Sequence, residues 1–271
     1  MKVSIIIACY NHGKFLTQSV KSALNQDYPN LEIVIANDGS TDNSLEVANS
    51  FKGDSRVVVI STENQGVVAT RNQAIWLSSG DYILPLDADD YLASDDVVSE
   101  MVKSLEESKS DLIFGNYQCF GGSTDLIKPE LKSQPNLLIK CFISATSLFT
   151  KDIFFKVGGY SEKMKDGYED WEFSIRAAAN GKINKIEKTI FFYRVQKVSR
   201  NNSANKISTN LFETIIANNQ QIYLSHMSEI LMLFRNDNDK LRKSLKAQKN
   251  IKKLLIFSVV LMGLLLVAFK I

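Results

Sequence analysis

The 271-residue sequence has few cysteines and lacks the common glycine-rich phosphate-binding loops. Its three cysteines, Cys9, Cys119 and Cys141, are far apart and lack metal-ligand spacing, which argues against a disulfide framework or a zinc site. We therefore expect reduced thiols and a cytosolic domain. No Gly-x-Gly-x-x-Gly follows the first apolar run, and no Gly-x-x-x-x-Gly-Lys-[Ser/Thr] occurs. A nucleotide site would have to be built from side chains.

Acidic residues are missing from the C-terminal part of the sequence. Residues 240–271 hold 8 Lys and Arg and no acid, which leaves 32 − 8 = 24 basic against 30 acidic residues in the rest, a balance of −6. An acidic body argues against a broad nucleic-acid surface, because phosphate backbones are bound by clustered Lys and Arg. The apolar run at residues 3–9 includes Ser4 and is followed by no cleavage site, so it predicts a buried strand rather than a signal peptide.

Apolar runs alternate with helical patterns in the first third of the sequence. Strands are expected at residues 3–10, 31–38, 56–62 and 81–87, with helices between them. This order predicts an α/β fold with right-handed crossovers and a mostly parallel central sheet that has helices on both faces. Ligands of such sheets bind beyond the carboxyl ends of the strands. Each end here is polar: Tyr10–Asn11, Asn37–Asp38, Glu63–Asn64 and Asp87–Ala88–Asp89.

The later part of the sequence continues this pattern less regularly. It predicts a helix at residues 97–108 and strands at 111–120 and 183–195. A less regular stretch follows the first of these strands, and we expect it to lie over the cleft. Glu169 and Asp170 open a further predicted helix, which Gly181 ends.

Residues 84–91 are an apolar strand end that runs into three aspartates. Side chains alternate along a strand, so Asp87 and Asp89 are expected on one side. Two carboxylates repel unless a cation lies between them, and Mg²⁺ or Mn²⁺ prefers carboxylate and phosphate oxygens. The pattern thus predicts a place where a metal and a diphosphate meet. In the alternative, Asp89 and Asp90 only begin a turn and Asp95 caps the next helix.

Asp38 and Arg71 extend this candidate site. A carboxylate at a strand end, such as Asp38, can accept hydrogen bonds from a base or ribose, and Arg71 could neutralise a diphosphate. In the alternative, Arg71 is a solvated residue on the surface of its helix.

Six segments occur in the order and approximate spacing typical of family 2 glycosyltransferases: IIIACYN, VIANDGSTDNS, NQGVVATRNQA, LPLDADD, VGGY and GYEDWEFSIR. The chain resembles this family from residue 3 to about residue 200. The resemblance implies the GT-A fold of nucleotide-diphospho-sugar transferases. It also implies inverting transfer of a sugar from a nucleotide diphosphate, for which UDP is expected, to a glycan or lipid-linked saccharide in cell-surface polysaccharide synthesis.

The resemblance also implies roles for single residues. Asp89 would bind a divalent metal, Mn²⁺ or Mg²⁺, and Asp87 would bind ribose or metal. Asp170 would be the general base, with Glu169 as its rival. Trp171 would stack on an acceptor sugar, unless it is a core residue. The residues implied to contact the donor nucleotide or its diphosphate are Tyr10, Asn11, Asp38, Asp42, Asn64, Gly66 and Arg71.

The sequence departs from the family pattern in two places, and two other functions stay open. Ala8 and Cys9 stand where relatives have Pro and then Thr or Val, and Gln196 stands where many have His. Glutamine is a poorer metal ligand than imidazole, which bears on metal affinity. One alternative is a sugar nucleotidyltransferase, which usually needs a glycine-rich loop with Arg or Lys after the first strand. The other is a non-catalytic membrane-tethered binding protein on the same fold.

Three regions are expected: a GT-A domain at residues 1–203, a helical and basic linker region at 204–253, and a hydrophobic membrane segment at 254–269. Residues 206–235 carry apolar positions in helical spacing. Residues 254–269 would reach about 24 Å as a helix, against a hydrocarbon core of about 30 Å. The preceding basic run predicts an anchor at the cytoplasmic face of the cell membrane. A buried helix or half of a re-entrant hairpin is the alternative.

Overall fold

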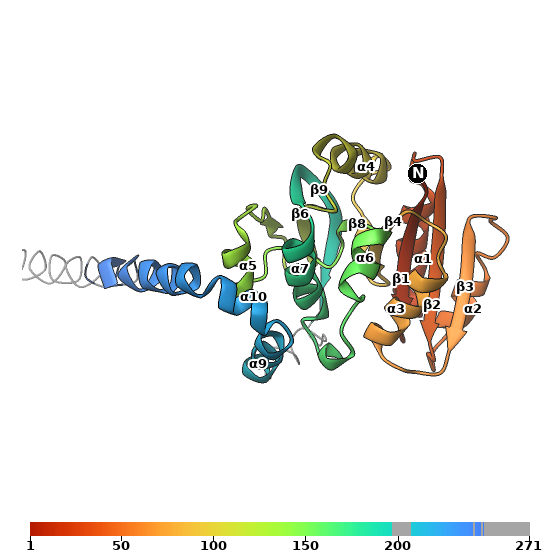
Figure 1. The fold of residues 1–271 in the computed structure, drawn as a ribbon. Coiled ribbons are helices and arrows are strands. Elements are labelled where there is room, and N and C mark those ends of the chain that lie inside the picture. Colours follow the sequence, from red (N-terminus) through yellow and green to blue (C-terminus); the bar gives the residue numbers. More distant parts are fainter. Residues whose placement is uncertain (197–206, 241, 245, 247–271) are drawn as a thin grey trace, which may run out of the picture. The chain divides into compact units, whose positions relative to one another are not determined.

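The computed structural model describes residues 1–196, 207–240, 242–244 and 246, and the chain divides into two compact units, Met1–Tyr223 and a second that begins at Leu224. The first unit contains a nine-stranded sheet (Figure 1). Its strands are β1 (Val3–Cys9), β2 (Leu31–Asp38), β3 (Val57–Thr62), β4 (Tyr82–Asp87), β5 (Tyr91–Leu92), β6 (Leu112–Gly121), β7 (Leu126–Ile127), β8 (Leu148–Thr150) and β9 (Ile183–Val195). Its helices are α1 (Gly13–Leu24), α2 (Ser44–Asn49), α3 (Val67–Leu77), α4 (Val97–Ser108), α5 (Gln134–Ile139), α6 (Lys151–Val157), η1 (Glu162–Met164), α7 (Glu169–Asn180) and α9 (Ser208–Asn218), and α10 (Gln220–Ser225) continues past the unit's last residue.

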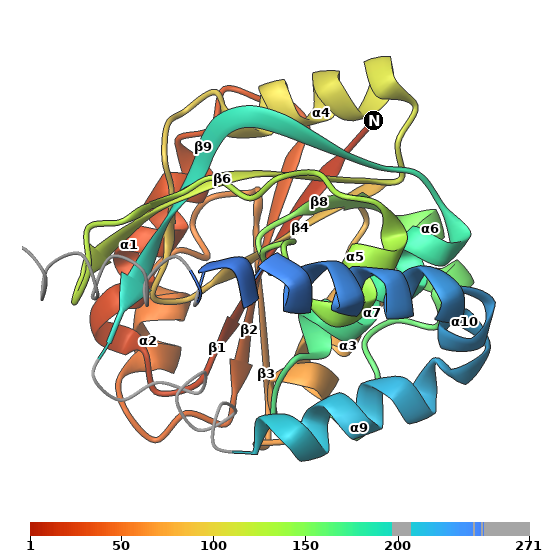
Figure 2. The same ribbon diagram turned by 90° about the vertical axis from the view of Figure 1, so that its left-hand side faces the viewer.

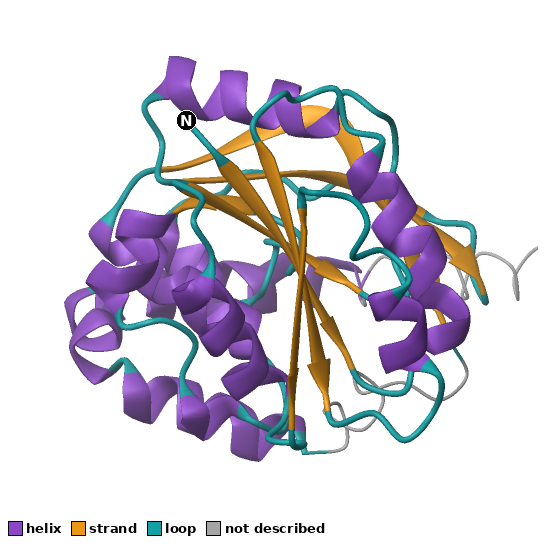
Figure 3. Ribbon diagram, turned by 90° about the vertical axis from the view of Figure 1, so that its right-hand side faces the viewer, coloured by secondary structure: helices purple, strands orange, loops and turns teal. Residues whose placement is uncertain are grey.

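The first half of the sheet, β3-β2-β1-β4, is parallel because each strand is followed by a helix that returns the chain to the same edge. Helices cover both faces of the twisted sheet (Figure 3), so β1, β2 and β4 are buried along nearly their whole length. On one face, Leu16 and Val20 of α1 belong to the same core cluster as Ile5 and Ile33. The four strands expected from the apolar runs are confirmed.

The second half of the sheet is mixed, whereas the sheet as a whole is mostly parallel, as predicted: only the short strands β5, β7 and β8 pair antiparallel. The strand order continues β4-β8-β6-β9-β5; β8 runs antiparallel to both β4 and β6, and β5 runs antiparallel to β9. The cause is the irregular stretch after β6. Because β6 points the same way as β4, this stretch begins at the carboxyl edge of the sheet, and the chain re-enters from that edge as β8. The stretch therefore lies at the edge where ligands of parallel sheets bind.

Strand β9 brings the end of the sheet back toward this same edge. It runs parallel to β6 and curves strongly along its length (Figure 2). The pairing shifts register on both sides of Asn116, a bulge that adds to the local twist. As a result, the last residues of β9 lie beside the turn that follows β4, where Tyr91 pairs with Phe192.

Helix α9 and the first residues of α10 belong to the first unit, which ends at Tyr223. Leu211 and Ile215 of α9 are buried, and the Tyr223 hydroxyl donates to the carbonyl of Leu138 at 2.7 Å. The helical pattern expected over residues 206–235 breaks at Asn219, whose side chain donates back to the carbonyl of Ile215 at 2.9 Å.

The predicted membrane segment, residues 254–269, lies outside the described residues. Within the described ranges, no helix combines the length and the apolar character needed to cross a bilayer. The anchor and the location at a membrane stay predictions.

Candidate active site

The predicted polar strand ends meet at the carboxyl edge of the parallel half of the sheet. In the register of the sheet, Cys9 lies beside Asn37, and Ala8 lies beside Asp87. Tyr10 follows directly after β1, and its side chain is 47% exposed at this edge. The aspartate turn and the segment after β1 therefore share one corner of the first unit.

The aspartates after β4 form a tight turn. The amide of Asp90 donates to the carbonyl of Asp87 at 3.0 Å, and the strand ends at Asp87, so strand alternation does not extend to Asp89. Burial and the charge of Asp87 raise the pKa of Asp89 above its usual range. One Asp89 oxygen, Oδ2, accepts a hydrogen bond from Nε2 of Gln196 at 2.6 Å, and the other, Oδ1, lies 3.9 Å from Nδ1 of His12.

Asp90 and Arg194 support this turn; the sequence indicated only a possible turn position for Asp90 and no role for Arg194. The Asp90 side chain accepts from the backbone amide of Arg194 at 2.7 Å, and the Arg194 guanidinium donates to the Asp89 carbonyl at 2.9 Å. Burial and the charge of Asp87 raise the pKa of Asp90 to about 9. The alternative interpretation of the turn predicted that Asp95 caps the next helix. In the structure, the residue that directly precedes α4 is Asp96.

Arg71 is a buried residue that bridges two parts of the site. It is 4% exposed, and its guanidinium forms ion pairs with Asp87 and with Glu169, the latter at 2.9 Å. This placement contradicts the alternative of a solvated helix arginine. The two carboxylates already engage the guanidinium that was expected to face a diphosphate.

The carboxylates at the start of α7 differ in their surroundings. Glu169 is 4% exposed and pairs with Arg71, whereas Asp170 is partly buried and one of its oxygens accepts from the backbone amide of Trp171 at 2.8 Å. Burial and the neighbouring charge of Glu169 raise the pKa of Asp170 to about 6. A carboxylate with a pKa near neutrality can accept a proton in a reaction.

Trp171 packs in the interior of the first unit. It is 8% exposed, its indole N–H donates to the carbonyl of Leu137 at 2.7 Å, and its ring stacks on Phe212 at a centroid distance of 5.6 Å. This arrangement favours a core residue over the predicted sugar-stacking role.

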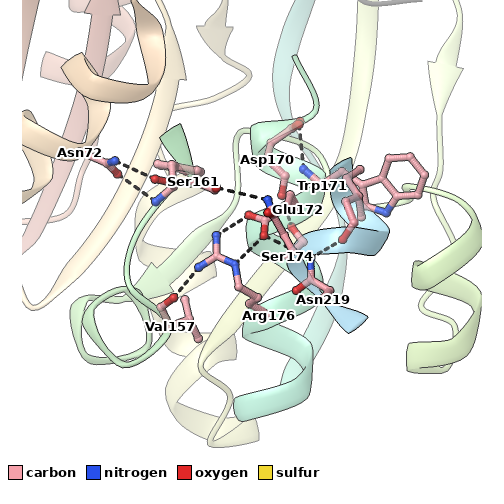
Figure 4. Close-up of polar contacts among 12 residues, drawn as sticks. Asn72, Val157, Ser161, Asp170, Trp171, Glu172, Ser174, Arg176 and Asn219 are labelled. Carbon is pink, nitrogen blue, oxygen red and sulfur yellow. Dashed lines mark hydrogen bonds and ion pairs between the residues drawn. The ribbon is translucent and has the colours of Figure 1, made fainter. Parts of the chain in front are cut away.

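A buried network that was not predicted from the sequence holds α7 in place. Glu172 is 1% exposed and forms an ion pair with Arg176; Asn219, beyond α9, donates to the same carboxylate at 3.2 Å (Figure 4). Nearby, the side chain of Asn72 on α3 donates to the carbonyl of Tyr160 at 2.8 Å and accepts from its amide at 2.9 Å. The network links α7 to α9, and the Asn72 bonds link α3 to the segment before α7. A carboxylate and an arginine four residues apart were the only signal in the sequence.

Two of the predicted nucleotide contacts join the loops after β1 and β2. The side-chain oxygen of Asn11 accepts from the amide of Thr41 at 2.8 Å. Asp42 accepts from the amides of Gly13 at 3.1 Å and Ser44 at 2.9 Å. These side chains shape the edge where Tyr10 is exposed.

Asp38 joins the loop after β2 to the loop after β3. It is 3% exposed, and its carboxylate accepts from the amides of Gln65 at 2.8 Å and Gly66 at 3.0 Å. Gly66 has φ of 89°, which favours glycine. At Gly39, an added Cβ would lie 2.5 Å from the amide nitrogen of Asn64, so the two loops are in close contact. The predicted residues Asp38, Asn64 and Gly66 thus lie together.

Oxygen and nitrogen donors for a cation meet at Asp89. In the described part of the chain, no cluster of three or more His, Cys, Asp or Glu side chains is arranged to hold a metal alone. Asp89 and His12 nevertheless offer a carboxylate and an imidazole, and the charge of Asp87 lies close enough to raise the pKa of Asp89. Mg²⁺ and Mn²⁺ commonly take one or two carboxylates and complete their coordination with substrate phosphates and water. The residues present therefore fit a divalent cation bound together with a diphosphate.

The first unit is an α/β domain whose polar corner lies at the carboxyl edge of its sheet, and comparison with known proteins gives its family. Glycosyl transferase family 2 matches residues 4–161, more than half of the sequence, and the chain belongs to this family. Glycosyltransferase GlyG of Streptococcus pneumoniae is 37% identical over 117 residues, which are 42% of this chain and 38% of GlyG. The chain therefore spans well under half of that relative.

Another relative matches over most of both chains. The UDP-Glc:alpha-D-GlcNAc-diphosphoundecaprenol beta-1,3-glucosyltransferase WfaP of Escherichia coli is 29% identical over 221 residues, 79% of this chain and 82% of WfaP. Among solved structures, S. aureus TarS 1–349 in complex with UDP-GlcNAc is similar with a TM-score of 0.69 at 21% identity, covering 85% of this chain and 72% of that one. The mannosyltransferase PcManGT from Pyrobaculum calidifontis, in complex with GDP-Man and Mn²⁺, has a TM-score of 0.59 at 18% identity, covering 84% and 72%. These structures share the GT-A type of fold with this chain.

Proposed function

We propose that this chain is an inverting glycosyltransferase that moves a sugar from a nucleoside diphosphate, UDP first among them, to a glycan or lipid-linked saccharide in cell-surface polysaccharide synthesis. One observation carries the proposal: buried Arg71 connects Asp87, beside the donor corner, with Glu169, at the start of α7. The donor corner and the start of α7, where the candidate base Asp170 follows Glu169, are thereby fixed to the same side chain.

Glycosyl transfer to a hydroxyl makes two electrostatic demands. Negative charge develops on the leaving diphosphate, and a proton must leave the attacking oxygen. Asp170 meets the second demand, because burial and the charge of Glu169 raise its pKa to about 6 and so keep it basic enough to take a proton at neutral pH. Glu169 is less suited to this role, since Arg71 already neutralises it. Attack from the face opposite the leaving group inverts the anomeric centre.

The donor side is assigned to the corner around the aspartate turn. A divalent cation bound there, Mn²⁺ or Mg²⁺, supplies positive charge to the diphosphate. Asp89 and Asp87 would hold this cation, and exposed Tyr10 would face the nucleotide base. Asp38, Asn11 and Asp42 would act by fixing the loops that surround the nucleotide.

The acceptor is proposed to be lipid-linked or a growing glycan, and the protein is proposed to lie at the cytoplasmic face of the cell membrane. The printed name of WfaP gives a diphosphoundecaprenol-linked acceptor for that relative. The basic residues of 240–253 and the apolar segment 254–269 favour a membrane location. Together they support a location where such acceptors are available.

The donor assignment is tested by titrating the purified chain with a panel of nucleoside diphosphates, with Mn²⁺ and with EDTA. We expect one diphosphate, UDP, to bind more tightly with Mn²⁺, and Asp89→Ala to lose the metal-dependent part. No binding by a folded sample would favour the alternative of a tethered binding protein whose aspartate turn is only a turn.

The base is tested with Asp170→Asn, and Asp166→Asn serves as a matched control because Asp166 is an exposed carboxylate four residues earlier. We expect Asp170→Asn to abolish sugar transfer while UDP binding stays unchanged, and the control to retain both. Normal turnover in Asp170→Asn would remove Asp170 as the base. Formation of a nucleotide sugar from a nucleoside triphosphate and a sugar phosphate would instead establish the nucleotidyltransferase alternative.

A further inference from the structure

The two oxygens of Asp89 face different side chains. Oδ2 accepts a hydrogen bond from the amide of Gln196 at 2.6 Å, whereas Oδ1 faces Nδ1 of His12 at 3.9 Å. Building on the proposed function, we propose that His12 is a ligand of the divalent cation and binds it through Nδ1, together with Oδ1 of Asp89. His12 is outside every residue set that the sequence predicted for this site.

The distance between the two atoms fits a shared cation. At 3.9 Å the atoms are too far apart for a hydrogen bond, which needs about 2.7–3.2 Å between nitrogen and oxygen. Two ligands that each lie about 2.1 Å from one metal ion are separated by about 3.0 Å at a right angle and about 4.2 Å across the ion. The observed separation falls inside this range, so a cation can bind both atoms without a large movement of either.

The backbone of His12 is fixed, which makes the imidazole position reproducible. The His12 amide donates to the hydroxyl of Ser44 at 3.1 Å, and the His12 carbonyl accepts from the amides of Phe15 at 2.9 Å and Leu16 at 3.0 Å. The ring also makes an edge contact with Phe15, with centroids 6.0 Å apart. The next residue, Gly13, has no room for a side chain, because an added Cβ would lie 2.2 Å from Oδ1 of Asn43. The start of α1 therefore holds the ring beside Asp89.

Gln196 has a complementary role as a positioning residue. Its side-chain amide donates to Oδ2, which orients the carboxylate so that Oδ1 points toward His12. A neutral amide nitrogen does not bind a cation, so the imidazole on the other side of Asp89 is the nitrogen ligand available here. This arrangement accounts for a glutamine at position 196.

The direct test is pulsed electron paramagnetic resonance of Mn²⁺ bound to the full chain with UDP. The sequence holds two histidines, so in the His226→Gln variant any histidine nitrogen coupled to Mn²⁺ belongs to His12. We expect an imidazole-nitrogen coupling in this variant, and we expect it to change when the histidine is labelled with ¹⁵N. Mn²⁺ bound with UDP but without a histidine nitrogen would overturn the proposal.

Binding measurements give an independent test. We expect His12→Gln to weaken Mn²⁺ binding in the presence of UDP at least tenfold and to leave UDP binding in EDTA within twofold. Adding Gln196→His to this variant should restore part of the Mn²⁺ affinity, and His226→Gln alone should change nothing. An equal loss of UDP binding with and without metal would assign His12 to the diphosphate and refute the metal role.

The same titration separates this proposal from the proposed function. If the unmodified chain binds UDP without any dependence on Mn²⁺, both the metal site and the role of His12 are refuted. If binding depends on Mn²⁺ in the unmodified chain and equally in His12→Gln, only the role of His12 is refuted.

Discussion

Replacing Arg71 by methionine is expected to lower the free energy of unfolding of the first unit by about 3 kcal/mol. Arg71 is 4% exposed and pairs with Glu169, also 4% exposed, and with Asp87, whose side chain is 37% exposed. Removing one member of a buried ion pair leaves an uncompensated charge and typically costs about 3–5 kcal/mol. We expect a destabilisation at the lower end of this range because water can reach Asp87. The loss of stability then comes mainly from the buried, unpaired carboxylate of Glu169.

The assay is denaturant-induced unfolding in a double-mutant cycle of Arg71→Met and Glu169→Gln. The double variant has no buried unpaired charge at this place, so it should be more stable than Arg71→Met alone, with a coupling energy of at least about 1 kcal/mol. Arg56→Met is the matched control. Its partner is Asp54 and the two side chains are 37% and 33% exposed, so this change should cost less than about 1 kcal/mol. Equal losses for the two arginine variants, or additive effects in the cycle, would refute the reasoning.

Three further predictions concern single residues. Transfer should fall about tenfold for each pH unit below about 6 and level off above it, because Asp170 must be ionised to accept a proton; a flat profile across that range would contradict this. The raised pKa of Asp90, about 9, means that its stabilising contribution is complete below about pH 4 and is lost as the pH rises through about 9. Asp90→Asn should therefore flatten the pH dependence of the unfolding free energy, and an unchanged slope in thermal melts would count against the burial argument. Trp171→Ala should cost about 3 kcal/mol of stability and Trp171→Phe about 1 kcal/mol, since only phenylalanine keeps the stacking on Phe212; equal unfolding midpoints for alanine and wild type would disprove a core role.

The helices and strands whose apolar residues follow a clear pattern were predictable from the sequence. The apolar runs of β1, β2 and β4 and the helical spacing of α4 are local signals, and the structure has these elements within a residue or two of the expected ends. The same apolar runs also locate the carboxyl ends of the strands, where polar residues follow. The corner that contains Asp87 and Tyr10 was therefore also predictable. Residue types and order sufficed there because consecutive parallel strands share one carboxyl edge.

Contacts between distant segments were not predictable in this way. Arg71 pairs with Glu169, 98 residues later, and nothing near Arg71 in the sequence distinguishes it from a solvated helix residue. β8 has three residues, too few to show alternation, so the switch to antiparallel pairing was missed. The exposure of Trp171 depends on Phe212 of α9, and an aromatic residue at a helix start carries no information on that partner.

The shortness of β8 bears on how the domain opens. β8 joins the two halves of the sheet by two residue pairs with β4 and two with β6, whereas β1 and β2 share seven. Local unfolding is favoured where few contacts must break, so we expect β8 to open before the long strands of either half. In that opened state Arg71 would keep Asp87, on its own half, and give up Glu169. We therefore expect the start of α7 to be aligned with the donor corner only while the pairing of β8 is intact.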